Sequence, residues 1–211
     1  MKITKYGHCC LLIEERGLRI LTDPGNYTTE QNKITNIDVV LITHEHGDHF
    51  HVPSMIEIMK NNPDARIITN QAVAKLLEAQ GMKATIVGDG QTEQVSEVLF
   101  TGHGTKHAIV YKELGQVENT GYFIGPRLFY PGDAFYDPKK PVEILALPMG
   151  GPWLKISEVI EYALQISPKF AFPVHDGGLK NPEFMYGTAT KIFQENSIQL
   201  IPLEINRETE I

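Results

Sequence analysis

Cysteine is scarce in this sequence of 211 residues, and its two copies, Cys9 and Cys10, are neighbours. Adjacent cysteines rarely reach ordinary disulfide geometry, so we predict no structural disulfide. The sequence also lacks an apolar run of about 18 residues, the length that a membrane-spanning helix requires. No apolar stretch of the secretory kind precedes the first charged residues. These absences predict a reduced, cytoplasmic protein without membrane insertion.

No cluster of Lys or Arg stands out, and the formal net charge is −7. Because the nucleic-acid backbone is a polyanion, it repels an acidic chain that has no basic patch. Charged residues make up 21% of the sequence, which is ordinary for a soluble globular protein. We therefore predict a small-molecule substrate and no nucleic-acid partner. Association of identical copies is left open.

Low-complexity segments, Ser/Gly linkers and internal repeats are also missing, and 42% of the residues are hydrophobic. A chain of this length can bury one substantial core, so we predict a single domain over residues 1–211. Helical spacing marks residues 53–62, 71–81, 157–167 and 181–196. Within these helices, Asn70 is the expected N-cap of the second, Gly81 its end, and Pro182 a first-turn residue of the last.

Strand-like patterns fill most of the remaining sequence. They predict strands at residues 2–7, 10–15, 18–23, 37–43, 66–69, 84–88, 97–102, 107–112, 120–125, 127–133, 142–148, 169–175 and 198–205. Strands come first, and helices alternate with further strands from about Pro53 onward. This order predicts an α/β (α+β) fold in which two sheets pack together and helices cover the outside.

The residue that the sequence does concentrate is histidine, since four of its eight copies lie in the segment LITHEHGDHFHVP. In an extended chain, His44 and His46 point to the same side and can bind one ion. Gly47 permits a sharp bend, after which Asp48 and His49 face a second direction. Imidazole and carboxylate ligands suit zinc, iron or manganese, and no thiolate is expected to complete a closed structural zinc site. The alternative is a solvated polar loop that binds no ion.

The motif THEHGDH resembles the signature of the metallo-β-lactamase fold superfamily. Its expected companions follow in order, because TKHA contains His107, YPGDA contains Asp133 and PVHDG contains His175. Together with GHCCLLIE and NTGYFI, this order is most similar to the small metal-dependent hydrolase branch that includes ascorbate phosphate lactonase-like proteins. The resemblance covers nearly the whole chain. It implies a four-layer αββα sandwich with a metal site at one edge of the paired sheets.

The resemblance also implies a set of ligands for two divalent metal ions. The first ion would be held by His44, His46 and His107, the second by Asp48, His49 and His175, and Asp133 would bridge the two. His103 competes with His107 for the first ion. We favour His107, because KHAIVY followed by NTGYFI resembles the hydrolase branch. Zinc is the expected metal, with manganese and iron as alternatives.

Hydrolysis is the reaction that the resemblance implies. Two divalent ions about 3.5–4 Å apart can turn a bridging water into a hydroxide nucleophile. This nucleophile would attack a small ester, lactone or phosphodiester. Asp48 would accept a proton from the bridging water, and His8 or His51 would protonate the leaving group. The alternative is a non-catalytic metal-binding or scaffold protein on the same fold.

Two further features have open roles. Asp23, in LTDPG, either orients a ligand histidine through its second ring nitrogen or starts a turn before Pro24. The segment PMGGPW, residues 148–153, either forms a pocket wall that carries Trp153 or is a loop packed on the core.

Overall fold

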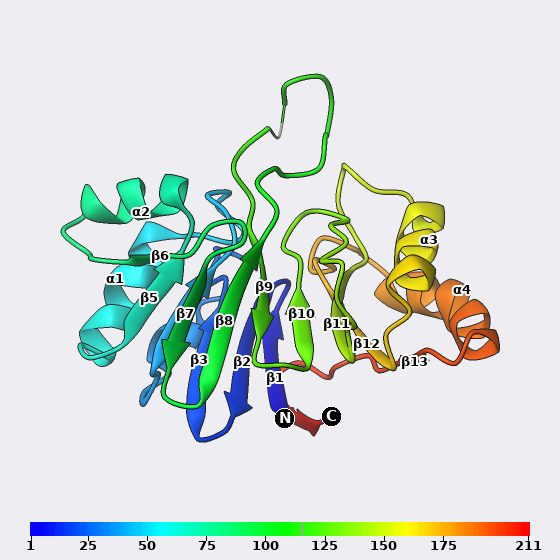
Figure 1. The fold of residues 1–211 in the computed structure, drawn as a ribbon, viewed down its shortest axis with the longest axis horizontal. Helices are drawn as coiled ribbons and strands as arrows, with labels where there is room; N and C mark the ends of the chain where they lie inside the picture. The colour runs from blue at the N-terminus through cyan, green and yellow to red at the C-terminus, as the bar shows by residue number, and fades with distance from the viewer. Residues whose placement is uncertain (115) are drawn as a thin grey trace.

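The computed structural model describes residues 1–114 and 116–211, and in this part of the chain the strands form two seven-stranded sheets that pack face to face (Figure 1). The first sheet has the strand order β14-β1-β2-β3-β4-β5-β6, and the second has the order β13-β12-β11-β10-β9-β8-β7. The strands of the first sheet are β1 (Lys2–Gly7), β2 (Cys10–Glu15), β3 (Leu18–Thr22), β4 (Val39–Ile42), β5 (Arg66–Thr69), β6 (Thr85–Ile86) and β14 (Glu208–Glu210). Those of the second are β7 (Thr92–Val95), β8 (Val98–His103), β9 (Gly121–Ile124), β10 (Leu128–Tyr130), β11 (Ile144–Pro148), β12 (Phe170–Val174) and β13 (Gln199–Leu200).

Helices cover the outer face of each sheet, so the predicted four-layer αββα sandwich is confirmed (Figure 1). The helices are α1 (Val52–Asn61) and α2 (Gln71–Glu78) beside the first sheet, and α3 (Ile156–Ile166) and α4 (Pro182–Glu195) beside the second. A short 3₁₀ helix, η1 (Glu30–Lys33), precedes β4. Among the described residues, no helix has both the length and the apolarity needed to cross a bilayer.

Strand β4 shows why the sequence forms a sandwich. Val39 and Leu41 pack into the core between the two sheets, whereas Val40 and Ile42 pack into the core under α1 and α2. All four are fully buried, which accounts for the unbroken apolar run predicted for this strand. Burial of each such side chain contributes roughly 1.5–3 kcal/mol, so a strand covered on both faces is strongly held in register.

The carboxyl ends of several strands meet at one edge of the sandwich. β4 runs parallel to β3 and β5, and β11 runs parallel to β10 and β12. In parallel sheets, ligands bind beyond the carboxyl ends of the strands. β4 leads directly into the histidine cluster, β10 leads to Asp133, β11 leads to residues 149–153, and β12 leads to His175. The topology therefore delivers residues that are distant in sequence to the same edge.

The helix signals read from the sequence are confirmed. The Asn70 side chain accepts a hydrogen bond from the Val73 N–H at 3.1 Å and so caps α2. Gly81 lies just beyond α2 with φ of +75°, a left-handed conformation that favours glycine. Pro182 occupies the first turn of α4, where the missing N–H is not needed.

The strand predicted at residues 107–112 is wrong. The backbone N–H groups of His107 and Ala108 donate to the carbonyl oxygens of Val117 and Asp133, at 3.0 and 2.8 Å, instead of forming a ladder with a neighbouring strand. This segment belongs to the long loop that projects beyond the sheet between β8 and β9 (Figure 1). Its β-branched residues are therefore not packed in a sheet, and Ile109 is 61% exposed.

Three smaller differences occur at the sheet edges. The strand predicted at residues 198–205 is reduced to β13, because Pro202 has no N–H to offer a ladder. β7 and β14 were not predicted, since TEQV and ETE lack the alternation of apolar residues on which strand prediction depends. β14 nevertheless pairs with β1, which places the two ends of the chain side by side.

Candidate metal centre

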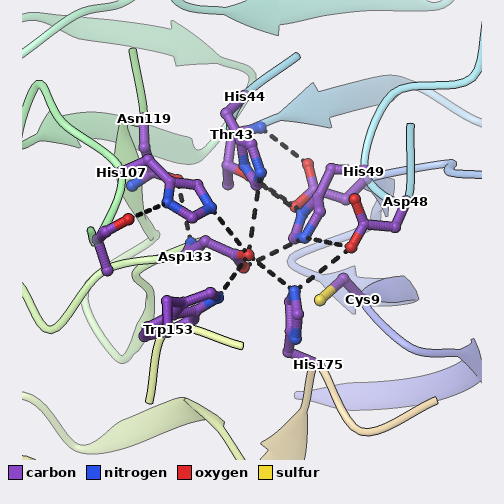
Figure 2. A network of polar contacts seen from close by, with 12 residues as sticks. Cys9, Thr43, His44, Asp48, His49, His107, Asn119, Asp133, Trp153 and His175 are labelled. Atoms are coloured by element: carbon purple, nitrogen blue, oxygen red, sulfur yellow. Dashed lines mark hydrogen bonds and ion pairs between the residues drawn. The ribbon is translucent and has the colours of Figure 1, made fainter. Parts of the chain in front are cut away.

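Asp133 lies at the middle of the site and is 2% exposed (Figure 2). Its Oδ2 atom lies 2.7 Å from His175 Nε2 and 3.2 Å from His107 Nε2. Its Oδ1 atom lies 3.2 Å from His49 Nε2. The Trp153 Nε1–H group donates to Oδ2 at 3.1 Å. One buried carboxylate thus meets side chains from four separate segments of the chain.

The turn after β10 places this carboxylate. Gly132 has φ of +64°, and a Cβ atom added there would lie 2.3 Å from Asn119 Oδ1. The same Asn119 oxygen accepts a hydrogen bond from the Asp133 N–H at 3.0 Å, and the Asn119 amide donates to Pro131 O at 2.9 Å. Both the conformation and the close approach require glycine, so Pro-Gly-Asp here serves to aim Asp133.

A first group of donor atoms comes from His44, His46 and His107, whose nitrogens lie within 4.8 Å of one another. His44 and His46 follow β4, and their ring centroids are 4.8 Å apart, as expected for side chains on one side of the chain. His107 reaches this pair from the loop between β8 and β9. The structure therefore brings together the three histidines assigned to the first ion.

His103 occupies a different environment at the end of β8. Its ring packs edge-on against Phe123 and Phe129, with centroids 5.5 and 5.8 Å away. Among the described residues, no donor group that could hold an ion includes His103. The geometry thus favours His107 over His103, and the ligand assignment itself stays a prediction.

A second group of donor atoms comes from His8, Asp48, His49 and His175, again within 4.8 Å of one another. Three of these are the residues assigned to the second ion, and His8 joins them from the end of β1. The Gly177 N–H donates to His8 Nδ1 at 3.2 Å, so the proton of the neutral ring is on Nε2, which lies 3.1 Å from Asp48 Oδ2. Both ring nitrogens of His8 are therefore held by hydrogen bonds within the site.

Asp23 takes the orienting role rather than that of a simple turn residue. Its Oδ2 atom lies 2.7 Å from His49 Nδ1 and accepts a hydrogen bond from the Tyr130 hydroxyl at 2.6 Å. Its Oδ1 atom accepts from the Thr43 N–H at 2.8 Å. A carboxylate on one ring nitrogen of a histidine fixes the ring and leaves the other nitrogen for a metal.

Two other histidines are oriented by backbone carbonyls. His175 Nδ1 lies 2.7 Å from Gly150 O, and His107 Nδ1 lies 2.5 Å from Ala108 O. Because a carbonyl only accepts, each Nδ1 carries the proton, and the neutral ring presents a bare Nε2 lone pair to the site. This is the tautomer that a metal ligand requires.

The residues present fit divalent cations. His44 Nε2, His49 Nε2, His175 Nε2 and Asp133 Oδ1 are buried, and no group in the described chain makes a hydrogen bond to them. Buried polar atoms of native proteins are almost always paired. Four unpaired donor atoms that converge on one point are explained by ions, and imidazole nitrogens with carboxylate oxygens are the ligands that zinc, manganese and iron share.

The electrostatics of the site agree with this fit. Burial, with the charge of His49 as the next cause, holds the pKa of His44 well below its ordinary value. Burial also acts to lower the pKa of His49 and His175, but Asp133 outweighs it and raises the pKa of His49 well above its ordinary value and that of His175 to about 11. Burial acts to raise the pKa of Asp133, yet the charge of His49 and the neighbouring histidines hold it well below its usual range. The centre of the site therefore favours positive charge.

A thiol also reaches the site, contrary to the expectation that none would. Cys9 is 1% exposed, and its sulfur lies within 4.8 Å of donor atoms of His49 and Asp133. Cys9 faces the core between the sheets, while Cys10 faces the core under α1 and α2. Alternation along the strand was the available signal, because one of two adjacent cysteines must face the interior of the sandwich.

Open space lies beside both donor groups. A hollow of about 380 Å³ adjoins the second group, and a smaller one of about 120 Å³ adjoins the first. Gly150, Gly151 and Pro152 line the larger hollow, and Trp153 lines the smaller. The segment 148–153 thus forms part of the wall beside the candidate ligands, the first of its two predicted roles.

Comparisons with known proteins agree with the fold and identify the family. A family model described as a β-lactamase superfamily domain matches residues 2–175. The Mycobacterium tuberculosis protein Rv0786c is 33% identical over 212 residues, which cover 97% of this chain and 98% of that protein. A UPF0173 metal-dependent hydrolase of Carboxydothermus hydrogenoformans is 30% identical over 194 residues, which cover 83% of this chain and 84% of the relative.

Two solved structures share the fold at low identity. Igni18, a metallo hydrolase of Ignicoccus hospitalis, has a TM-score of 0.77 at 19% identity and covers 100% of this chain and 98% of its own. An isothiocyanate hydrolase from Delia radicum gut bacteria has a TM-score of 0.78 at 14% identity and covers 100% of this chain and 99% of its own. At these identities the likeness concerns the fold.

Proposed function

The chain belongs to the metallo-β-lactamase superfamily and is one of its small metal-dependent hydrolases, and from this premise we propose that it cleaves a small ester, lactone or phosphodiester with a pair of divalent cations. Zinc is the proposed metal, with manganese and iron as alternatives, because imidazole and carboxylate ligands serve all three. The observation that carries the proposal is the convergence of unpaired buried donor atoms on Asp133.

We assign the ligands by the two groups of donor atoms. One ion would be held by His44, His46 and His107, the other by Asp48, His49 and His175, and Asp133 would bridge them. Support for the bridging role comes from the position of the carboxylate, since its two oxygens face histidines of both groups. When bound, two such cations acidify a shared water and polarise the oxygen under attack.

The protein side chains then have to move protons. Asp48 is 25% exposed at its side chain and borders both hollows, which supports its proposed role of accepting a proton from the attacking water. The neutral His8 ring donates its Nε2–H to Asp48 Oδ2 at 3.1 Å and so holds this carboxylate, and the proton that Asp48 accepts would pass to a leaving group in the larger hollow, which both residues line. His51 takes no part in this proposal, because it precedes α1 and its Nδ1 lies 2.9 Å from the Ser54 hydroxyl.

Metal analysis combined with a substrate panel tests the proposed function. The protein is produced with ample zinc, manganese or iron, and the bound metal is counted before assay with esters, lactones and phosphodiesters. Two ions per chain and turnover of at least one class are expected. Asp64→Asn, at an exposed position, is a matched control that should leave both unchanged.

The rival is a non-catalytic metal-binding or scaffold protein on the same fold. It predicts two bound ions and no turnover of any member of the panel. A chain that retains no ion after growth with all three metals would contradict both readings.

A further inference from the structure

A cavity of about 580 Å³ adjoins the larger hollow beside the candidate metal centre. The two spaces share His8 and Leu179 as lining residues. Gly177 lines the cavity where the chain packs closely on Tyr27 and His8, because a Cβ atom added there would lie 2.8 Å from the Tyr27 ring and 3.1 Å from His8 Cβ. The cavity therefore lies directly behind His8 and Leu179, the two residues that it shares with the hollow beside the candidate ligands.

Apolar side chains form much of the cavity wall. Leu179 and Pro182 contribute from the loop after β12 and the start of α4, and Leu203 and Ile205 from the segment before β14. Apolar surface of this kind gains free energy when an apolar group displaces water from it. This apolar part of the wall is thus suited to a hydrocarbon group.

The charged groups of the cavity wall are either paired or acidic, since Glu183, which also lines the cavity, is an exposed carboxylate. Lys5 is 2% exposed, and its Nζ donates to both carboxylate oxygens of Asp176 at 2.6 Å and to Pro173 O at 2.9 Å. Glu204 forms an ion pair with Arg207 at 2.8 Å. Among the described lining residues, Lys5 is the one Lys or Arg side chain, and Asp176 neutralises it. Nothing in this wall is left to hold an anion.

The two hollows next to the candidate ligands also lack, among the described residues that line them, a basic side chain of the Lys or Arg type. Their walls include Tyr27, Pro152 and Trp153. Lys155 lines a separate hollow beyond Trp153. Proteins that select phosphate esters usually supply Arg or Lys for the phosphoryl oxygens. This site has no such side chain to offer.

We propose that the substrate is an uncharged ester or lactone, and that its apolar acyl or aryl group occupies the cavity behind His8. The inference rests on the proposed hydrolase function and selects carbonyl substrates over phosphodiesters. Most of the binding free energy of the substrate would then come from its hydrocarbon group and not from a charged group.

A chain-length series tests the inference. Esters of one phenol with acyl groups from acetyl to octanoyl should show kcat/KM rising by about fourfold for each methylene that is buried, until the cavity is full. The phosphodiester of the same phenol and its hemisuccinate should be poorer substrates than the butanoyl ester. A flat series, or a preference for either anionic substrate, would overturn the inference while leaving the hydrolase function in place.

Variants locate the effect. Leu179→Trp, at the wall shared by the cavity and the hollow, should flatten the rise of kcat/KM with chain length. Leu99→Trp, on β8 and 42% exposed, is the matched control and should keep the slope of the native protein. Equal slopes in the two variants would count against the cavity as the binding site.

A binding measurement separates this inference from the proposed function. Methyl ketones of the same chain lengths cannot be hydrolysed, and Trp153, the single tryptophan of the chain, reports their binding through its fluorescence. Their dissociation constants should fall by about fourfold per methylene even if every ester is inert. Inert esters together with tight long-chain ketones would reject the hydrolase and keep the apolar site. Ketones whose binding does not depend on length would reject the site.

Discussion

At the scale of single residues, Asp133 has the most consequential position in the molecule. It faces His49, His107 and His175 from within a buried turn. An acidic group this deeply buried needs positive charge close by, and histidines or cations can both provide it. Substitution of Asp133 would leave these three buried histidines without their shared carboxylate. It therefore tests the candidate metal centre most directly.

Asp133→Ala should lose metal and activity with little loss of fold. The change removes the proposed bridge, so metal content should fall well below two ions per chain and kcat/KM by at least about 100-fold. Metal analysis and circular dichroism, measured on the same sample, check the prediction. Native metal content or full activity in this variant would end the bridging assignment.

The choice between two histidines is also decided at this scale. His107→Ala should reduce metal content, because its Nε2 belongs to the first donor group. His103→Ala should keep the metal and instead lower the free energy of unfolding by about 1–2 kcal/mol, since its ring packs against Phe123 and Phe129. Metal analysis and urea unfolding of both variants decide the matter, and metal loss in His103→Ala would reverse the assignment.

At the scale of elements, the turns that follow the strands position the candidate ligands. Gly132 and Gly90 both have positive φ, of +64° and +74°, but a Cβ atom at Gly132 meets Asn119 at 2.3 Å whereas nothing lies within 4 Å at Gly90. Substitution of Gly90 by alanine therefore tests the left-handed backbone conformation alone, whereas substitution of Gly132 tests that conformation together with a steric clash.

Gly132→Ala should destabilise the protein more than Gly90→Ala and should also lower its metal content. In Gly90→Ala the left-handed conformation costs about 1 kcal/mol, whereas Gly132→Ala additionally displaces the turn that aims Asp133. Urea unfolding and metal analysis of both variants provide the comparison. Equal behaviour of the two would show that the close approach at Gly132 is unimportant.

A buried ion pair ties three elements together behind His175. Lys5 of β1 pairs with Asp176, which follows the candidate ligand His175, and the Tyr186 hydroxyl of α4 donates to the same carboxylate. Lys5→Met would leave the Asp176 carboxylate buried without its counter-charge, at a cost of about 3–5 kcal/mol. Tyr186→Phe removes one hydrogen bond and should cost only about 1 kcal/mol. Urea unfolding measures both, and an equal loss in the two would contradict a buried charge pair.

At the scale of the whole molecule, the candidate ligands connect the two sheets. His44, His46, Asp48 and His49 follow a strand of the first sheet, whereas His107, Asp133 and His175 lie on segments of the second. Ions bound between them would act as cross-links that exist only in the folded state. Binding of this kind stabilises the fold in proportion to the logarithm of free metal concentration.

Removal of metal by a chelator should therefore lower the melting temperature. When the free ion is present at 100 times its dissociation constant, its binding adds about 2.7 kcal/mol to the free energy of unfolding. For a chain of this size, loss of the ion should lower the melting temperature by roughly 5–10 °C. Differential scanning calorimetry with and without chelator measures it. Asp133→Ala is the control, since a variant that has already lost its metal should shift much less.

Much of the site was predictable because its signals are local. The spacing in THEHGDH indicated ligands on two sides of a bend, and Asn70, Gly81 and Pro182 marked helix ends through conformational preferences of single residues. Residues 107–112 were misread, since a β-branched run has the same appearance in a sheet and in a loop whose hydrogen bonds go elsewhere.

The sequence by itself determined the layered architecture, the family and the set of candidate metal ligands. Tertiary structure alone decided that His107 and not His103 lies with His44 and His46, that Cys9 reaches the same centre, and that an apolar cavity lies behind His8. The reason is physical. Preferences for helix, turn and metal belong to neighbouring residues, whereas nearness between segments that are distant in sequence depends on how two sheets pack, which no local pattern encodes.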